Sequence, residues 1–172
     1  MNLRLESKRL LLRPFQPEDA PYLLELNNDE EVMRYTGDKP FKDLKEALEF
    51  IEKYGHTSES PNGKYGIGRL GVVHKETLEF LGWAGLNWQE EEQEIDIGYR
   101  FFRRHWGKGF ATEAGQCIFD HAFSDQALSS IIAYVHELNL GSQKVVEKLG
   151  MHLTHRFLWE NREPARYYRI TK

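Results

Sequence analysis

The segment from residue 104 to residue 111 combines residue types that could bind a phosphate group. Gly107 and Gly109 can adopt positive φ angles and let a ligand approach the backbone, while Arg104 and Lys108 add positive charge. A helix is expected to begin here, and the first turn of a helix has unpaired N–H groups and about half a positive charge from the helix dipole. The segment therefore predicts a nest for a pyrophosphate group, with an ordinary strand-to-helix turn as the alternative.

The elements that would position this segment follow from the spacing of apolar residues. Strands rich in aliphatic and aromatic residues are expected at 65–74, 78–88, 94–102 and 128–135. Helices are expected on either side of the last of these strands, at 110–123 and 139–149, and Gly150 would end the second helix. The first three strands should form an antiparallel meander that leads into the glycine-bearing segment.

The two ends of the chain complete this pattern. The N-terminal residues predict a strand pair or one bent strand, followed by a helix that Pro17 opens and a short helix at 29–36. A further helix is indicated by the spacing of Leu44, Leu48 and Ile51. A last strand pair is expected at 151–159 and 165–171. Because no repeat or linker interrupts these elements, we expect one α+β domain over residues 1–172.

The composition limits the classes of protein to which the chain could belong. Hydrophobic residues make up 40% and charged residues 29% of its 172 residues, as is ordinary for a soluble globular protein. The net charge of −4 includes no basic excess, which argues against a nucleic-acid partner. The single cysteine, Cys117, excludes a disulfide scaffold within the chain and suits a reducing compartment. No stretch is apolar enough for a membrane span or a signal peptide, so we expect a cytoplasmic protein without a membrane partner.

Several stretches of the sequence resemble the GNAT superfamily of N-acyltransferases. The R-x-x-G-x-G string of Arg104, Gly107 and Gly109 is similar to the family's CoA-pyrophosphate loop. Residues 139–151, an asparagine followed by an expected helix and then Lys-Leu-Gly, resemble the second family block. Residues 10–14 and 31–35 resemble the subgroup that holds ribosomal-protein N-terminal (alanine or serine) acetyltransferases. The string by itself has low specificity, but the order and spacing of these blocks over nearly the whole chain make the resemblance specific.

The resemblance implies a fold and a reaction. The fold would be a mixed, mostly antiparallel sheet of about seven strands flanked by helices. Its central strands, here 94–102 and 128–136, would splay apart and bind the pantetheine arm of acetyl-CoA like an added strand. A primary amine would attack the thioester directly in a ternary complex, so neither a protein nucleophile nor a metal is expected. The implied cofactor contacts are Ile97, Gly98, Tyr99, Arg104, His105, Trp106, Gly107, Lys108, Gly109, Phe110, Ala111, Asn139 and Ser142.

A general base is needed because an ammonium group has no lone pair. Asp96 stands where the resembling proteins often have a glutamate, and Glu94 lies two residues earlier on the same face of the expected strand. Either carboxylate could accept the proton directly or through water. The alternative is that both belong to a solvated acidic hairpin. For residues 90–92 that alternative is preferred, and their functional option is to attract a cationic amine.

Two further roles concern the carbonyl oxygen and the departing thiolate. A backbone N–H near residues 97–99 would stabilise the oxyanion. The family's usual acid, a tyrosine seven residues after the asparagine, is replaced by Val146. Ser142 fits the ribosomal subgroup, in which a serine lies near the sulfur, and it could donate a hydrogen bond or only orient the thiolate. Asn139 could contact the pantetheine or cap the helix, and the first role is slightly preferred.

Other functions are weighed against this hypothesis. The absent tyrosine leaves open a CoA-binding module with weak or no catalysis, and the nest could also serve a nucleotide-binding regulator, although no Lys-Ser pair follows Gly109. The acceptor could be a protein N-terminus, a polyamine, an amino acid or an aminoglycoside, and the subgroup resemblance favours a protein N-terminus or a small amine. Exposed strand edges are compatible with a homodimer.

Two further patterns are interpreted as structural. Residues 66–71 match G-x-G-x-x-G, but the dinucleotide motif requires a helix directly afterwards and the sequence there predicts a strand. His152 and His155 are three residues apart on an expected strand, which would place them on opposite faces. Cys117 and His121 could pair on a helix, but two ligands do not complete a metal site, so no metal is expected.

Overall fold

The computed structural model describes residues 3–54, 67–124, 128–159 and 162–172, and its centre is one mixed sheet. Eight strands lie in the order β1-β2-β3-β4-β5-β6-β8-β7. All neighbouring pairs are antiparallel except β5 and β6, which are parallel. The strands are β1 Leu5–Glu6, β2 Leu10–Arg13, β3 Arg69–His74, β4 Phe80–Gln89, β5 Glu94–Phe101, β6 Ser130–His136, β7 His152–Leu158 and β8 Pro164–Thr171.

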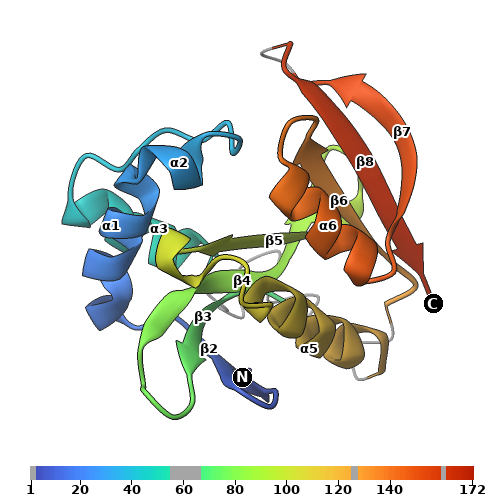
Figure 1. The fold of residues 1–172 in the computed structure, drawn as a ribbon. Coiled ribbons are helices and arrows are strands. Elements are labelled where there is room, and N and C mark those ends of the chain that lie inside the picture. Colours follow the sequence, from blue (N-terminus) through green and yellow to red (C-terminus); the bar gives the residue numbers. More distant parts are fainter. Residues whose placement is uncertain (1–2, 55–66, 125–127, 160–161) are drawn as a thin grey trace.

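Five α-helices and two short 3-10 helices are described around the sheet (Figure 1). Their bounds are η1 Pro17–Asp19, α1 Ala20–Asn28, α2 Glu30–Met33, α3 Leu44–Tyr54, η2 Arg103–His105, α5 Phe110–Ser124 and α6 Leu140–Lys148. Local sequence sets several of these boundaries. The side chain of Asp29 accepts hydrogen bonds from the first turn of α2, and Asn139 does the same for α6. Gly150 follows α6 with a φ of +82°, a conformation that favours glycine.

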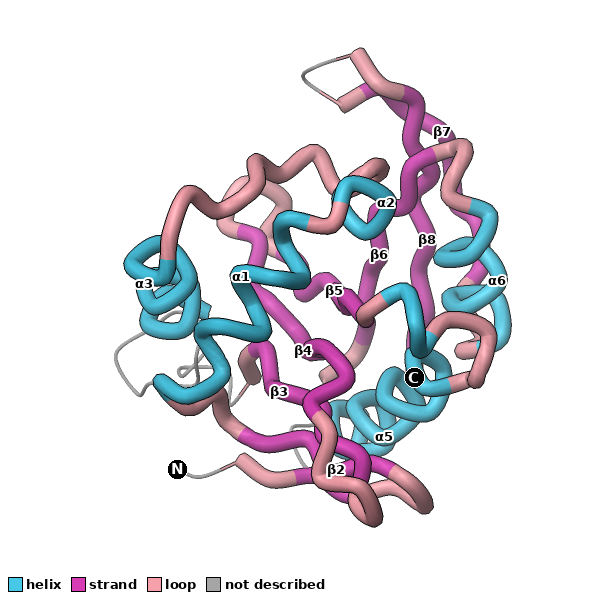
Figure 2. The backbone as a smooth tube through the Cα atoms, turned by 60° about the vertical axis from the view of Figure 1, so that its left-hand side comes forward, coloured by secondary structure: helices cyan, strands magenta, loops and turns pink. Residues whose placement is uncertain are grey.

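The helices cover the sheet on two faces. Apolar residues of β5 such as Ile95 and Ile97 belong to one core cluster with Phe110, Ala114 and Ile118 of α5. On the other face, Trp83 of β4 belongs to a second cluster with residues of α1 and α3. Figure 2 shows α1 and α3 on one side of β3, β4 and β5, with α5 on the other. We call these sides the α1 face and the α5 face.

The observed architecture confirms the expected α+β class and the mostly antiparallel sheet. The sheet has eight strands rather than about seven, because the N-terminal residues form the pair β1 and β2. The segment 69–74 is the strand β3, so no helix follows the glycines of the G-x-G-x-x-G string. Gly66, the first of these glycines, lies outside the described residues. None of the helices in the described parts of the chain is long and apolar enough to cross a membrane.

The expectation that His152 and His155 face opposite sides of the sheet is wrong. The pairing of β7 with β8 shifts register between Leu153 and His155. As a result, His152 lies opposite Arg169 and His155 lies opposite Tyr167, two residues apart on β8. Cross-strand neighbours share a face, so the bulge places both histidines on the same side. The His155 ring stacks on Tyr167, with centroids 4.6 Å apart.

Candidate active site

The two central strands of the sheet separate after one point of pairing. In the described structure β5 and β6 pair only where Asp96 lies beside Ile132. The outer edge of β5 pairs with β4, and that of β6 pairs with β8. Figure 1 shows β5 and β6 moving apart beyond this point. The facing edges of residues 97–101 and 133–136 could therefore accept an extended, amide-bearing ligand as an added strand. The expected splay of the central strands is confirmed.

The strands β5 and β6 thus leave a gap between them. The glycine-bearing segment, residues 104–111, follows β5 at the wide end of this gap. Gly107 and Gly109 have φ angles of +74° and +80°, in the left-handed region that L side chains rarely adopt. The first hydrogen bond of α5 runs from the Glu113 N–H to the Gly109 carbonyl. The N–H groups of Phe110 and Ala111 precede that bond and have no partner within the helix. The backbone therefore forms the kind of cradle that binds an anion at a helix N-terminus.

The two cations of this segment are used differently. The guanidinium of Arg104 binds Glu25 at 3.2 Å and Glu79 at 3.3 Å, and it lies 4.0 Å from the centre of the Phe102 ring. These contacts hold Arg104 to other side chains of the protein. Lys108 is exposed. In this structure the positive charge beside the cradle is thus supplied by Lys108 and the helix dipole more directly than by Arg104.

His105 and Trp106 brace the segment. His105 is buried, and its Nε2 lies 3.0 Å from the Glu79 carboxylate. Burial lowers the pKa of His105, although the Glu79 charge and hydrogen bond oppose that shift. The Trp106 Nε1 donates a 2.8 Å hydrogen bond to the Phe101 carbonyl, which ties the turn to the end of β5. Both residues were expected cofactor contacts, and both make structural contacts here.

Arg9 is a neighbour of the cradle that the sequence did not indicate. Its Nη2 donates to the Lys108 carbonyl at 3.0 Å, and its Nε lies 2.7 Å from the Glu113 carboxylate. The guanidinium also lies 4.4 Å from the centre of the Phe110 ring. These contacts form because β1 and β2 lie beside α5. The sequence around residue 9 does not indicate that position.

Asp96 lies at the narrow end of the gap on the α1 face. Its side chain is buried and accepts a 2.8 Å hydrogen bond from the Gln89 Nε2. Burial raises the pKa of Asp96, and the opposing positive charge of Arg69 does not outweigh it. A carboxylate with a raised pKa accepts protons more readily than an ordinary aspartate, which suits a general base.

Glu94, the other candidate base, is already bound by two groups. The Tyr167 hydroxyl and the Arg169 guanidinium both donate to its carboxylate. These contacts connect the start of β5 to β8 across β6. Glu94 therefore lies on the same face as Asp96, as expected, but its carboxylate is held in an ion pair.

The start of α6 brings together the residues expected near the sulfur. The Asn139 Oδ1 accepts a 3.1 Å hydrogen bond from the Ser142 N–H, so Asn139 caps the helix. The Tyr99 hydroxyl of β5 donates to the Ser142 carbonyl at 3.2 Å. This contact connects the two sides of the gap on the α5 face. Val146, which stands where the family's tyrosine would be, is fully buried in the core.

The backbone of Ile97, Gly98 and Tyr99 lines one side of the gap. These residues pair with Leu86, Gly85 and Ala84 of β4. Successive N–H groups of a strand point to opposite edges, so alternate amides of this stretch face β6. Such an amide has the chemistry required to stabilise an oxyanion.

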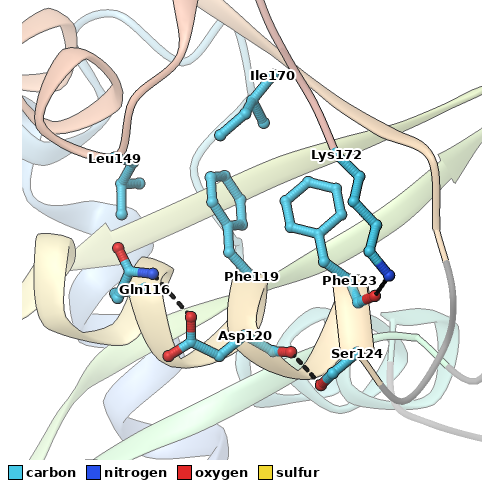
Figure 3. A pocket seen from close by; sticks show the side chains of 8 residues that line it. All are labelled: Gln116, Phe119, Asp120, Phe123, Ser124, Leu149, Ile170 and Lys172. Atoms are coloured by element: carbon cyan, nitrogen blue, oxygen red, sulfur yellow. Dashed lines mark hydrogen bonds between the residues drawn. The ribbon is translucent and has the colours of Figure 1, made fainter.

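One other hollow of the surface does not contain this chemistry. A groove of about 470 Å³ lies between α5 and the end of β8 (Figure 3). Its polar groups bind one another, since Gln116 donates to Asp120 at 2.8 Å and Lys172 donates to the Phe123 carbonyl at 2.6 Å. None of the expected site residues lines it. Within the described residues, no three metal-ligating side chains come together. Burial raises the pKa of the Cys117 thiol, so this cysteine is not an activated nucleophile.

Comparison with known sequences identifies one family. Residues 9–152 match the sequence model of the acetyltransferase (GNAT) domain. The uncharacterized N-acetyltransferase p20 of Bacillus licheniformis is 36% identical to this chain over 147 residues. That alignment covers 85% of this chain and 80% of p20.

Solved structures share the fold. An acetyltransferase from Agrobacterium tumefaciens strain C58 is 26% identical and has a TM-score of 0.83, with 99% of this chain and 95% of that chain covered. The spermidine N-acetyltransferase of Vibrio cholerae, solved with CoA and spermine, has a TM-score of 0.77 over 96% of each chain. At 20% identity, this second match shows the fold alone.

Proposed function

The chain belongs to the GNAT family of acetyl-CoA-dependent N-acetyltransferases, and on that premise we propose that it transfers an acetyl group to a primary amine in a ternary complex. The observation that supports this proposal most strongly is the single pairing of β5 and β6, followed directly by a glycine cradle at the start of α5. One half of that arrangement suits an amide-bearing arm, and the other suits a pyrophosphate.

Acetyl-CoA would lie along the gap with its two ends in different chemical surroundings. The pyrophosphate would accept hydrogen bonds from the backbone of residues 107–111, with Lys108 nearby. The pantetheine amides would pair with the facing edges of β5 and β6. The thioester would then lie toward the narrow end, close to Asp96, while the start of α6 contributes Ser142.

The reaction follows from these positions. Asp96 takes one proton from the acceptor ammonium, and the freed lone pair attacks the thioester carbon. A backbone N–H of residues 97–99 stabilises the oxyanion. The C–S bond then breaks, the nitrogen loses a second proton, and the thiolate gains one, while the Ser142 hydroxyl donates a hydrogen bond to the sulfur. One amide, one thiol and one released proton account for all atoms and charges.

Two acceptor classes fit this chemistry. The acids of residues 90–94 make the approach to Asp96 attractive to a cation, as a polyamine or a protein N-terminus would be. The Vibrio cholerae neighbour that was solved with spermine supports testing a polyamine. The resemblance to ribosomal-protein acetyltransferases supports testing a peptide that begins with alanine or serine.

Acetyl transfer to spermidine and to an alanine-initiated peptide tests this proposal, with Asp96→Asn as the diagnostic variant. Asparagine keeps the shape of the side chain but cannot accept the proton, so kcat should fall about 100-fold or more. The wild-type rate should also fall as the pH drops through the raised pKa of Asp96, because a protonated carboxyl is not a base.

Exposed Glu91 provides the matched control for the chemical step, since Glu91→Gln removes a charge that at most attracts the acceptor and should leave kcat unchanged. An active Asp96→Asn variant would remove Asp96 from the mechanism. The second candidate function, a CoA-binding module without catalysis, is favoured by the apolar Val146 in place of an acid. It would be supported if the wild-type protein bound CoA but acetylated neither amine.

A further inference from the structure

Tyr134 lies on the α1 face of β6, just beyond the point where β5 and β6 separate. It is two residues after Ile132, the partner of Asp96, so its side chain shares a face with Asp96. It also lies opposite Tyr167 of β8, and the two rings meet edge to face with centroids 5.4 Å apart. Tyr134 therefore borders the gap on the side opposite β5.

The hydroxyl of Tyr134 is buried and has no hydrogen-bond partner among the described residues. A buried polar group without a partner costs about 1–3 kcal/mol, so such groups are rare unless they have a use. The neighbouring ring of Phe157, 5.7 Å away between centroids, offers no acceptor. The hydroxyl is thus available to a molecule that enters the gap from the α1 face.

The charges that act on this hydroxyl are negative, although two cations lie near them, because Arg169 pairs with Glu94 and Arg69 lies near Asp96. Burial raises the pKa of the Tyr134 phenol, and the charges of Glu92, Asp96 and Glu94 raise it further. The phenol therefore stays protonated at neutral pH. The same carboxylates would repel an oxyanion and attract a cation. The expected partner of the Tyr134 oxygen is consequently an N–H donor with positive charge.

Most other polar groups nearby are already bound, and the buried Arg69 Nε, which has no partner among the described residues, can only donate. The Glu94 carboxylate is bound by Tyr167 and Arg169. The Arg100 guanidinium, further along β5 on the same face, donates to Asn27 and Asp38. Asp96 has side-chain hydrogen bonds with Gln89 and Asn87, and an ionised carboxylate has about four lone-pair positions. Tyr134 and Asp96 thus retain the capacity to accept a hydrogen bond from a new ligand.

We propose that the Tyr134 hydroxyl and the Asp96 carboxylate together form the subsite for the acceptor's ammonium group. The inference rests on the proposed function and specifies which side of the gap the amine uses. The ammonium donates one N–H to the Tyr134 oxygen and transfers a proton to Asp96. The Tyr134 contact then holds the nitrogen while its lone pair points at the thioester carbon.

Tyr134→Phe tests this subsite because it removes only the hydroxyl. The KM for spermidine or for the alanine-initiated peptide should rise about tenfold or more, as expected for a lost hydrogen bond to a charged group. The dissociation constant of acetyl-CoA should stay within about twofold, because the CoA arm contacts backbone. The midpoint of thermal unfolding should stay the same or rise, since an unsatisfied buried hydroxyl is removed.

Tyr168→Phe is the matched control. Tyr168 is the next residue on β8 after Tyr167, faces the α5 side, and donates a weak 3.4 Å hydrogen bond to Glu147. Its loss should leave the acceptor KM unchanged. The variant thus reports what removing a phenol hydroxyl from the same strand pair does without the proposed contact.

Three results would overturn the inference. An unchanged acceptor KM in Tyr134→Phe would show that the hydroxyl does not hold the amine, even if kcat falls. A lowered unfolding midpoint together with weakened acetyl-CoA binding would show a structural role. If the wild-type protein binds acetyl-CoA but acetylates neither amine, the proposed function is wrong, and the proposed acceptor subsite is then wrong as well.

Discussion

Asp96 is a residue whose burial affects stability and catalysis in opposite directions. Its carboxyl group is buried at the single described pairing of β5 and β6, and burial raises its pKa. The folded state therefore binds the proton more tightly than the unfolded state. Folding is then favoured most below the ordinary aspartate pKa, and that contribution is lost as the pH rises through the raised pKa. At neutral pH the protein retains a buried charge that it would be more stable without.

Asp96→Asn should consequently stabilise the protein at pH 7 while it abolishes most of the activity. The gain in unfolding free energy should exceed the roughly 0.5 kcal/mol scatter of surface substitutions. It should nearly disappear near pH 3.5, where the wild-type carboxyl is mostly protonated in both states. Denaturant unfolding at the two pH values measures it. Glu91→Gln, at an exposed position, should show no such gain, and a destabilised Asp96→Asn at pH 7 would contradict the argument.

The glycine cradle is the element whose conformation depends most directly on residue type. Gly107 has a φ of +74°, and an added Cβ would meet nothing within 4 Å. Gly37, in the loop after α2, has a φ of +72° and is equally open. Alanine at either position would therefore meet the same backbone strain without a steric clash. The two glycines differ in that Gly107 lies where the pyrophosphate is proposed to bind.

Gly107→Ala and Gly37→Ala form a matched pair for this element. Both should destabilise the protein by about 1 kcal/mol, because both force alanine into the left-handed region. Only Gly107→Ala should also weaken acetyl-CoA binding, by about tenfold, since the added methyl group and any backbone shift disturb the phosphate contacts. Calorimetric titration with acetyl-CoA measures this difference. Equal affinities in the two variants would place the pyrophosphate elsewhere.

At the scale of elements, the sequence predicted what depends on neighbouring residues. The glycine turn before α5 and the end of α6 at Gly150 each have a local signal in residue type. The bulge at Leu153 and His155 has none, because it depends on how β7 pairs with β8. Likewise, no local pattern in the sequence predicted the contact of Arg9 with the Lys108 carbonyl, since it joins segments far apart in the chain.

The same distinction applies to the candidate site. Asp96 and Ser142 could be named from their motifs, whereas Tyr134 could not. The role of Tyr134 was inferred from its unpaired hydroxyl and from its register with Ile132 and Tyr167. Both features can be seen only in the folded sheet. The sequence also gave no sign that Arg104 would be held by Glu25 and Glu79.

In the whole molecule, two parts of the sheet meet with little strand pairing between them. β1–β5 and β6–β8 are joined in the described structure by the pairing of Asp96 with Ile132. Side chains add bridges around the gap, from Glu94 to Arg169 and from Tyr99 to Ser142. A ligand that pairs with both facing edges would join the two parts along the length of the gap, and should therefore stabilise the fold as a whole.

Thermal unfolding with acetyl-CoA, desulfo-CoA and ATP tests this central claim most directly, because it requires no knowledge of the acceptor. A ligand at about 100 times its dissociation constant adds about 2.7 kcal/mol, which raises the midpoint of a protein this size by roughly 5–10 °C. We expect both CoA compounds to give such a shift and ATP, which lacks the pantetheine arm, to give little. No shift with either CoA compound, or an equal shift with ATP, would contradict the binding of CoA between β5 and β6.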